Sequence, residues 1–395
     1  MSNPLYRKVA IVGVGATPYY RRGESQPQTI TELAGKAILA AAQDAGISVK
    51  DIDGFAHYSG GGSGHNNFAD TNLIMEALGI PEIGFTATLT MGGGGSAASI
   101  GLAGAAILAG DAKYVVSLMA LQQGNNRLGV VLGAKPPTPE SSFVQPAGMV
   151  GPGHAMAIMA RRHMHKYGTR REAFAEIAIT HRNHAMVRPT SLQKKPLTLE
   201  AYMSARMIAE PLCLYDYCLE TDGAVAVIST SAERARDLRQ KPVYLLGSVH
   251  GGRREWGRSF SWMNMPDDIF TSAGNLSIAR LLYEKTGLTP QNIDVALLYD
   301  HFSPLVMMQL EDYGFCPVGE GGPFVESGAI RMNGSIPVNP HGGNLSEGYV
   351  IGMTHVREAV EQLRGTAVNQ VKGAGLALVT GGPAPIPVSG IILGS

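Results

Sequence analysis

Cysteine is scarce in this chain of 395 residues, which contains only Cys213, Cys218 and Cys316. Three cysteines cannot form a fully paired disulfide framework. The first 15 residues also lack the long apolar segment of an export signal. We therefore expect a cytoplasmic protein with reduced thiols, in which a buried free thiol is the simplest role for each cysteine.

Net charge is absent as well, because 32 Lys and Arg residues balance 32 Asp and Glu residues. Without a field that concentrates polyanions, neither nucleic acid nor an anionic membrane is expected as a partner. No run of 18 uninterrupted apolar residues occurs, so no membrane span is expected. Charged residues make up only 16% of the chain, against about 25% in an average soluble domain. Part of the surface is therefore expected to be buried in an oligomer.

Glycine, by contrast, is plentiful, with 50 residues in short clusters between apolar segments. Residues 9–14 form an apolar run typical of a buried strand, and residues 29–45 place apolar side chains at helical spacing before Gly46. The glycine cluster 92–95 then precedes an alanine-rich helix predicted to end at Leu108. Strands and helices that alternate in this way predict a layered α/β fold with largely buried strands.

The later part of the chain repeats this order. Residues 288–299 (LTPQNIDVALLY) echo residues 47–58 (ISVKDIDGFAHY), and a second glycine-rich segment, 342–348, precedes a helix predicted at 354–363. Solenoid proteins repeat units of about 20–50 residues. A single repeat over a much longer distance indicates instead that a whole half of the chain is duplicated.

Polar residues follow the apolar strand at the end of this repeat, namely Tyr299, Asp300 and His301. They would emerge at the carboxyl end of the strand, the edge of an open α/β sheet at which ligand sites form. Residues 339–349 (NPHGGNLSEGY) form a glycine-rich loop whose backbone N–H groups could converge on a ligand oxygen. Tyr349 is expected at a helix start, where the helix dipole favours its phenolate. A structural turn with a packed tyrosine is the alternative.

Closely spaced histidines do not make a convincing metal site. His163 and His165 are two residues apart, which places them on different faces of a helix. His181 and His184 can share a face, but no carboxylate or cysteine beside them completes a ligand set. Residues 13–18 (GVGATP) lack the third small residue of a dinucleotide fingerprint. We therefore expect neither a metal nor a nucleotide cofactor.

Taken together, these segments resemble the thiolase superfamily, in its lipid-transfer and sterol-carrier-thiolase branch. The resemblance extends over essentially the whole chain and rests on VAIVGVGATP, IDGFAHY, TDGAVAVIST, NPHGGNLSEGY and ALVTGG. It implies a five-layered αβαβα fold of two duplicated halves, usually assembled as a homodimer. The halves would be residues 1–240, with a loop and cap region at about 121–205, and residues 241–395.

Several residues of the family's active site are missing. The thiolase nucleophile would fall at about Gly92 or Gly93, and no cysteine occurs in the first 212 residues. The family's second cysteine would fall within residues 378–380 (LVT). Tyr349 replaces the family's catalytic histidine, and Tyr299 replaces the histidine or asparagine of the strand-end motif. Without a nucleophile no acyl-enzyme forms, so a working thiolase is excluded.

Two tyrosines in these places resemble the thiolase-like aldolases of bacterial steroid side-chain degradation. The resemblance implies retro-aldol cleavage of a β-hydroxyacyl-CoA at C17, which releases a 17-ketosteroid and a short acyl-CoA such as propionyl-CoA. Tyr349 would be the base, with its pKa lowered by the helix start and by His341, and Tyr299 would be the proton donor. The reverse assignment stays open. The substrate carries its own coenzyme A, so no separate cofactor is expected.

The resemblance also implies an enolate-binding site and a protein partner. The candidate residues of that site are Gly92, Gly93, Gly94, Asp300, His301, His341, Asn344 and Gly381. The related aldolases need a small OB-fold partner, in some cases fused to a hydratase subunit, which completes the active site. Two alternatives remain, a non-catalytic homologue that binds acyl-CoA or lipid and a divergent acyltransferase that uses one of the three cysteines.

Overall fold

Alternate residues of β1 (Val9–Ala16) face two different hydrophobic cores. Val9 and Ile11 pack into one core, and Ala10 and Val12 pack into the other. Side chains of a strand point to opposite faces in turn, so a strand buried on both faces needs a continuous apolar run. The computed structural model describes residues 3–58, 69–89, 92–124, 142, 145–149, 151–252, 270–382 and 387–395.

Strands of the first half pair in the order β4-β3-β5-β8-β1. β3 pairs parallel with β4 and β5, whereas β5 pairs antiparallel with β8, and β8 with β1. The elements of this half are β1, β2 (Tyr20–Arg21), α1 (Ile30–Ala45), β3 (Gly54–Tyr58), α2 (Thr71–Leu78), β4 (Phe85–Leu89), α3 (Gly95–Ala109), β5 (Val115–Gln122), β8 (Thr221–Ser231) and α8 (Ala232–Ala235).

The second half repeats this pairing order as β10-β11-β12-β9. β10 pairs parallel with β11 and, at Ala296, forms a parallel bridge to Val338, which takes the place of β4. β11 and β12, then β12 and β9, pair antiparallel. The elements are β9 (Val243–Gly251), α9 (Leu276–Thr286), β10 (Val295–Leu297), α10 (Ser303–Asp312), α11 (Gly321–Glu326), α12 (Gly343–Ser346), α13 (Met353–Arg364), β11 (Leu376–Gly381) and β12 (Val388–Gly394).

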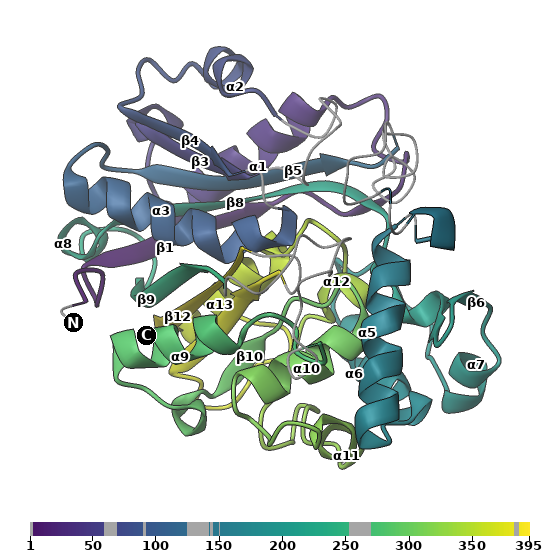
Figure 1. Ribbon diagram of the computed structural model, residues 1–395. Helices are drawn as coiled ribbons and strands as arrows, with labels where there is room; N and C mark the ends of the chain where they lie inside the picture. The colour runs from purple at the N-terminus through teal and green to yellow at the C-terminus, as the bar shows by residue number, and fades with distance from the viewer. Residues whose placement is uncertain are drawn as a thin grey trace.

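Helices lie outside and between the two sets of strands (Figure 1). α1 packs on the outer face of the first set, and α9 packs against β9 and β12 of the second. α3 and α13 contact strands of both halves and form the middle layer. β1 and β9 pair antiparallel and join the two sets into one continuous sheet. The sequence of layers across the two sets is therefore helix, strands, helix, strands, helix. Together with the repeated strand order, it confirms the predicted thiolase-like αβαβα fold of two duplicated halves.

The middle-layer helix α3 is apolar on every side. With the turn before it, the segment Gly92–Ala109 is long and apolar enough to cross a membrane by length and composition alone. In the structure, however, 61% of this segment is buried, and α3 contacts strands of both halves. A helix enclosed by other elements needs apolar residues on all its faces, so this composition is explained by its place in the core.

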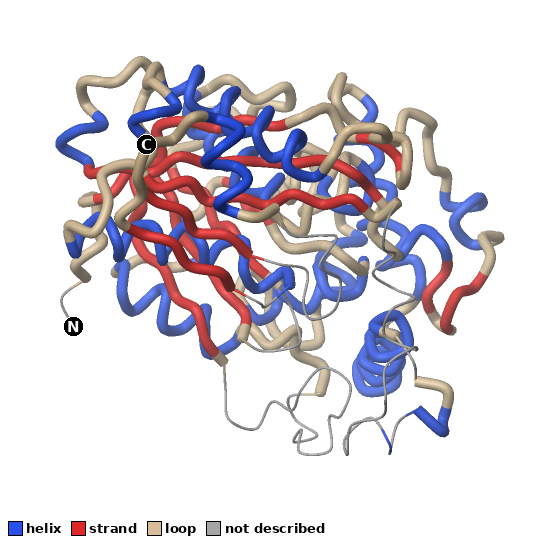
Figure 2. Tube along the Cα trace, turned by 90° about the horizontal axis from the view of Figure 1, so that it is seen from above, coloured by secondary structure: helices blue, strands red, loops and turns tan. Residues whose placement is uncertain are grey.

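A cap of helices is inserted within the first half, between β5 and β8. Its elements are α5 (Pro152–Tyr167), α6 (Arg171–Met186), α7 (Leu199–Met203), β6 (Met207–Ala209) and β7 (Leu212–Cys213). The β6–β7 hairpin forms a small sheet of its own, at the edge of the molecule in Figure 2. α6 packs against α10, α11 and α12, and so reaches the second half. Most of residues 121–153, the first part of the predicted loop and cap region, lies outside the described residues.

Candidate active site

Tyr299 lies where the turns of the two halves meet, two residues beyond the end of β10. A Cβ atom added to Gly93, from the first half, would lie 2.2 Å from Cζ of Tyr299. A Cβ atom added to Gly352 would lie 2.7 Å from Cδ2 of the same ring. Both distances are far below any real contact of a Cβ atom, so glycine is required at 93 and 352 to admit the tyrosine ring.

The hydroxyl groups of Tyr299 and Tyr349 are hydrogen-bonded to each other at 3.1 Å. Both side chains belong to the core between the two halves, and their exposed fractions are 2% and 9%. The backbone N–H of Tyr349 donates to Oγ1 of Thr221, at 2.9 Å, which ties the loop to β8. The two tyrosines singled out in the sequence are therefore direct neighbours.

The sequence predicts Tyr349 at a helix start, but the structure does not place it there. α12 ends at Ser346 and α13 begins at Met353, so Tyr349 lies in the connection between them. Burial raises the pKa of Tyr349 far above 10, and the nearby Cys218 thiol and Asp300 carboxylate raise the pKa further. Burial likewise raises the pKa of Tyr299, with Tyr349 as the next cause. The prediction of a lowered pKa for Tyr349 is wrong, since both phenols are held protonated.

The Asp300 carboxylate holds the glycine-rich loop. Its carboxylate accepts the backbone N–H groups of Asn344, at 2.9 Å, and Leu345, at 3.2 Å. A Cβ atom on Gly343, whose φ is +63°, would lie 2.0 Å from Oδ2 of Asp300. The carboxylate therefore fits only under a glycine in a left-handed conformation.

Two histidines complete the surroundings of Asp300. Nδ1 of His181 lies 3.0 Å from its Oδ2, and Nε2 of His355 lies 3.0 Å from its Oδ1. Nε2 of His355 is also 3.0 Å from the carbonyl oxygen of Leu298, so this nitrogen carries the proton. Burial alone would raise the pKa of Asp300, but hydrogen bonds from His181 and His355 lower the pKa to about 2. Asp300 is thus a buried carboxylate whose oxygens are engaged by the protein itself.

His301 and His341 are both neutral in this environment. Burial lowers the pKa of His301 to about 3 and holds the pKa of His341 well below 6.5. The ring of His341 packs edge-on against His355, with 4.8 Å between ring centroids. A neutral imidazole supplies no positive charge for a phenolate, so His341 does not lower the pKa of Tyr349 in the way predicted.

Several buried polar groups near Asp300 have no hydrogen-bond partner among the described residues. These are both ring nitrogens of His341, Nδ1 of His301, and the amide nitrogen and oxygen of Asn344. An unsatisfied buried polar group lowers the stability of the fold by about 1–3 kcal/mol, so a purely structural role does not explain why these groups are buried. Such groups are therefore candidates for contact with a ligand or with bound water.

The first-half turn supplies the remaining predicted residues. Gly92–Gly94 form one turn of 3-10 helix directly before α3. A Cβ atom on Gly381 would lie 3.0 Å from the carbonyl oxygen of Gly93, so β11 closes on this turn from the second half. The carbonyl of Gly94 accepts from Oγ of Ser389, at 2.7 Å. The structure therefore brings the predicted glycines and tyrosines together, although they come from both halves.

The cysteines are poorly suited to nucleophilic chemistry. Burial raises the pKa of Cys213 to about 11 and that of Cys316 to about 12. Burial also raises the pKa of Cys218, the thiol whose charge contributes to the raised pKa of Tyr349. Because the thiolate is the reactive form, all three thiols are expected to be inert. No three His, Cys, Asp or Glu residues that could hold a metal gather within the described ranges.

Sequence reasoning missed His181 and His355. His181 was considered only as a metal ligand, together with His184, whose Nδ1 lies 3.1 Å from the carbonyl oxygen of Asn339. The shared helix face of His181 and His184 could have indicated that both side chains face the second half, where they contact Asp300 and Asn339. His355 lies inside α13 and belongs to no recognisable motif. Its contact with Asp300 follows only from the packing of α13 under β10.

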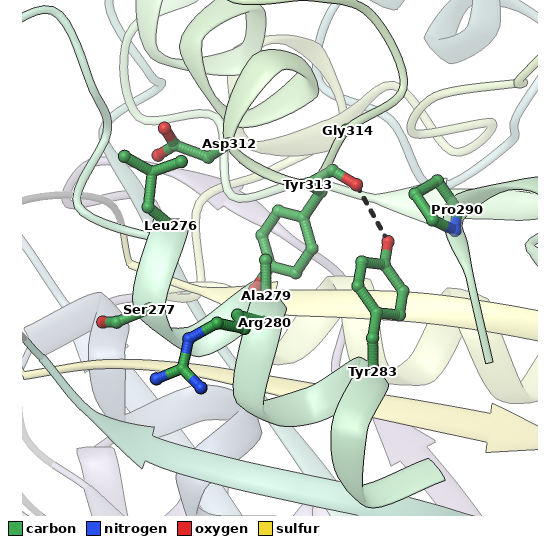
Figure 3. Close-up of a pocket in the computed structure, with 9 residues that line it drawn as sticks. All are labelled: Leu276, Ser277, Ala279, Arg280, Tyr283, Pro290, Asp312, Tyr313 and Gly314. Carbon is green, nitrogen blue, oxygen red and sulfur yellow. Dashed lines mark hydrogen bonds between the residues drawn. The ribbon is translucent and has the colours of Figure 1, made fainter. Parts of the chain in front are cut away.

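A hollow of about 640 Å³ lies elsewhere, beside α9 and the end of α10 (Figure 3). In this hollow Tyr283 donates a hydrogen bond to the carbonyl oxygen of Tyr313, at 3.0 Å. None of the predicted site residues contributes to its lining, which is Leu276, Ser277, Ala279, Arg280, Tyr283, Pro290, Asp312, Tyr313 and Gly314.

Comparison with known proteins identifies the family to which this fold belongs. Residues 257–390 match the family model described as thiolase C-terminal domain-like. The 17-hydroxy-3-oxo-4-pregnene-20-carboxyl-CoA lyase of Mycobacterium tuberculosis is 38% identical, over 98% of this chain and 99% of the relative. The steroid side-chain-cleaving aldolase of Thermomonospora curvata is 36% identical, over 98% and 97% of the two chains.

A solved structure of the Ltp2-ChsH2(DUF35) aldolase superposes with a TM-score of 0.90 at 34% sequence identity. The match covers 99% of this chain and 98% of the other. Relatives of such identity over whole chains share their family as well as their fold. The chain therefore belongs to the thiolase superfamily, in the branch that contains the steroid side-chain-cleaving aldolases.

Proposed function

We propose that this chain is a carbon–carbon lyase that cleaves a steroid β-hydroxyacyl-CoA by a retro-aldol reaction. The substrate class is that of a 17-hydroxy steroid C20-carboxyl-CoA, and the products are a 17-ketosteroid and a short acyl-CoA such as propionyl-CoA. The names of the two curated relatives described above support this reaction class. The observation that carries the proposal is the hydrogen bond between the hydroxyls of Tyr299 and Tyr349.

A pair of protonated tyrosines can carry out this reaction as a relay. Tyr349 accepts the proton of the substrate hydroxyl while it passes its own proton to Tyr299, which in turn protonates the α-carbon of the enolate. The O–H electron pair forms the ketone C=O bond, and the pair of the broken C–C bond ends in the new C–H bond. Neither phenol becomes a free phenolate, which agrees with the raised pKa of each.

The enolate oxygen needs hydrogen-bond donors that are already in place. We assign this role to the backbone N–H groups of Gly92, Gly93 and Gly94 and to the Asn344 amide, with His341 and Gly381 beside them. The unpartnered buried amide of Asn344 supports its inclusion. Asp300, which is fully buried, acts in this scheme by holding the loop, and His301, whose ring centroid lies 5.2 Å from that of Tyr299, packs beside the tyrosine.

The test is cleavage of a 17-hydroxy steroid acyl-CoA by the chain co-expressed with its partner. Tyr299→Phe and Tyr349→Phe are each expected to lower kcat by about 10²–10⁴, with unchanged urea unfolding. Tyr283→Phe, which removes a hydroxyl from the hollow beside α9, is the matched control and should keep full activity. Full cleavage by the double variant would contradict the proposal. Tight binding of acyl-CoA without any turnover would indicate a non-catalytic binding protein instead.

We also propose a homodimer and a small OB-fold partner, fused or unfused to a hydratase subunit. The name of the solved relative joins a second component, ChsH2(DUF35), to the aldolase. β4 pairs with β3 along one edge and is half exposed, with no strand on its other edge among the described residues. An unpaired edge is suited to pair with a second copy. The cytoplasmic location and the boundary at residue 240 stay predictions.

A further inference from the structure

Glu347 precedes Tyr349 by two residues, and its carboxylate is buried, with 1% of the side chain exposed. Oε1 of Glu347 lies 2.5 Å from Nε of Arg188. The same oxygen accepts a hydrogen bond from Oγ1 of Thr190, at 3.1 Å. A buried carboxylate is costly unless it is paired and hydrogen-bonded, so the place of Glu347 depends on Arg188.

Arg188 contacts three carboxylates at once. Besides Glu347, its Nη1 lies 2.6 Å from Oε2 of Glu358, and its Nη2 lies 2.7 Å from Oε2 of Glu361. Only 3% of the Arg188 side chain is exposed. Glu358 and Glu361 belong to α13, whereas Arg188 follows α6 of the cap by two residues. One planar guanidinium group, with donors in a fixed arrangement, therefore joins the cap, α13 and the loop of Tyr349.

The backbone on either side of Glu347 is held by the same region. The carbonyl of Glu347 accepts the N–H of Leu192, at 2.9 Å. Gly348 lies against the ring of Tyr19, since a Cβ atom there would be 2.9 Å from Cδ2 of the ring. The hydroxyl of Tyr19 accepts from Nη1 of Arg357, at 3.1 Å. Glu347 is thus the charged anchor of a short loop segment that reaches Tyr349, whose backbone N–H is held in turn by Thr221.

We propose that Arg188 is a positioning residue for Tyr349, acting through Glu347. This inference rests on the proposed function, because it assumes that the place of the Tyr349 hydroxyl matters for proton transfer. Arg188 itself is enclosed by carboxylates and contacts neither tyrosine. Loss of its charge frees Glu347 to turn toward water, and the adjoining Tyr349 then leaves its hydrogen bond with Tyr299.

The test compares Glu347→Gln with Glu361→Gln in the full chain with its partner. Both variants remove one carboxylate from Arg188, but only Glu347 belongs to the loop of Tyr349. Glu347→Gln is expected to lower kcat about tenfold with KM unchanged, since small misplacement of a catalytic group is costly. Arg188→Lys should lower kcat at least as much, and Glu361→Gln less than twofold. In a Tyr349→Phe background, Glu347→Gln should have no further effect on kcat.

A second readout does not depend on turnover. In a chain labelled with 3-fluorotyrosine, the ¹⁹F resonance of residue 349 is identified by its absence from Tyr349→Phe. Glu347→Gln should shift this resonance, and Glu361→Gln should leave it in place. The proposal is overturned if both variants act alike, or if Glu347→Gln changes neither the resonance nor kcat. A shifted resonance in a chain that never cleaves the thioester would instead refute the proposed function and leave the positioning role intact.

Discussion

Tyr58 and Tyr299 occupy the same place in the two halves, at the ends of the matching segments 47–58 and 288–299. Each ring packs on a glycine at the start of the middle-layer helix of its own half. A Cβ atom on Gly95 would lie 2.5 Å from Cβ of Tyr58, and one on Gly352 would lie 2.7 Å from the ring of Tyr299. Each side chain also reaches the turn of the opposite half.

The two hydroxyls differ in what they meet there. The hydroxyl of Tyr58 donates to the main-chain carbonyl of Ile351, at 2.8 Å. The hydroxyl of Tyr299 meets the hydroxyl of Tyr349 instead, at 3.1 Å. A carbonyl oxygen only accepts, so the proton of Tyr58 stays in one place, whereas two hydroxyls can each donate or accept. The same duplicated position therefore gives a tyrosine bonded to the main chain in one half and, under the proposed function, a proton-transferring tyrosine in the other.

Apart from loss of the tyrosine hydroxyls themselves, the largest effect is expected from Gly93→Ala, which tests whether the first-half turn lacks side chains in order to admit Tyr299. The new Cβ atom would lie 2.2 Å from Cζ and 2.5 Å from Oη of Tyr299. The ring must move by about 1 Å, which is expected to cost about 100-fold in kcat. Steady-state cleavage assays of the complex with its partner measure this change.

Gly35→Ala is the matched control for this prediction. A Cβ atom on Gly35, in α1, would meet its nearest atom, Cδ2 of Leu78, at an ordinary 3.6 Å. Alanine is the better helix former by about 1 kcal/mol, so activity should stay constant and thermal stability should hold or rise. Unchanged cleavage by Gly93→Ala would contradict the packing argument for the first-half turn.

The second effect concerns the groups that hold the two turns. A neutral hydroxyl, that of Ser389, bonds the first-half turn at Gly94, whereas the Asp300 carboxylate bonds the second-half turn. Asp300 has a folded-state pKa of about 2, below the usual value of about 4 in an unfolded chain. Its contribution to stability is therefore present above about pH 4 and is lost as the pH falls toward 2. Asp300→Asn should lower the free energy of unfolding by about 3 kcal/mol at pH 7 and should remove this acid-dependent loss.

Urea unfolding followed between pH 2 and 8 measures this difference, and Asp312 provides a control of opposite sign. Burial raises the pKa of Asp312 to about 7, although Ser272 donates to its carboxylate at 2.7 Å. Wild-type stability due to Asp312 therefore falls as the pH rises from about 4 to 7. Asp312→Asn should remove that fall. Identical pH profiles for the two variants would show that neither carboxylate has the environment described.

The smallest effect is expected from Tyr58→Phe. This change removes the hydrogen bond to Ile351, which is worth about 1 kcal/mol, and leaves the ring on Gly95. Cleavage should fall less than threefold, in contrast to the same substitution at Tyr299. Parallel kinetic and unfolding measurements on the two variants give the comparison directly. A loss of activity at Tyr58 as large as at Tyr299 would mean that both tyrosines transfer protons.

The fold was predictable because its signals are local and repeated. The echo of residues 47–58 in 288–299 and the two glycine-rich turns anticipate the duplicated strand order. The sequence singles out Tyr299 and Tyr349 because they replace reactive residues of a known family, and the structure brings their hydroxyls together. The protonation of the two tyrosines was not predictable, because burial between the halves raises the pKa of each phenol and outweighs any local helix dipole.

The surroundings of the site were less accessible to sequence reasoning. The contacts of Asp300 with His181 and His355 were not predicted, because these partners come from distant elements that only the tertiary packing brings together. Arg188 and Glu347 were not singled out, since an isolated arginine and glutamate in a polar segment predict only a solvated surface. Their burial follows from the docking of α6 against α12, which has no local signal.

The contact between Gly93 and Tyr299 also has an evolutionary consequence. The volume that a side chain would occupy in one half is filled by a side chain from the other, so the two positions cannot change independently. A mutation that placed a cysteine at 93 would first collide with the tyrosine ring. Under the proposed function, a smaller residue at 299 would first abolish proton transfer. Each single step toward thiolase chemistry would then be a loss, and such a path requires both halves to change together.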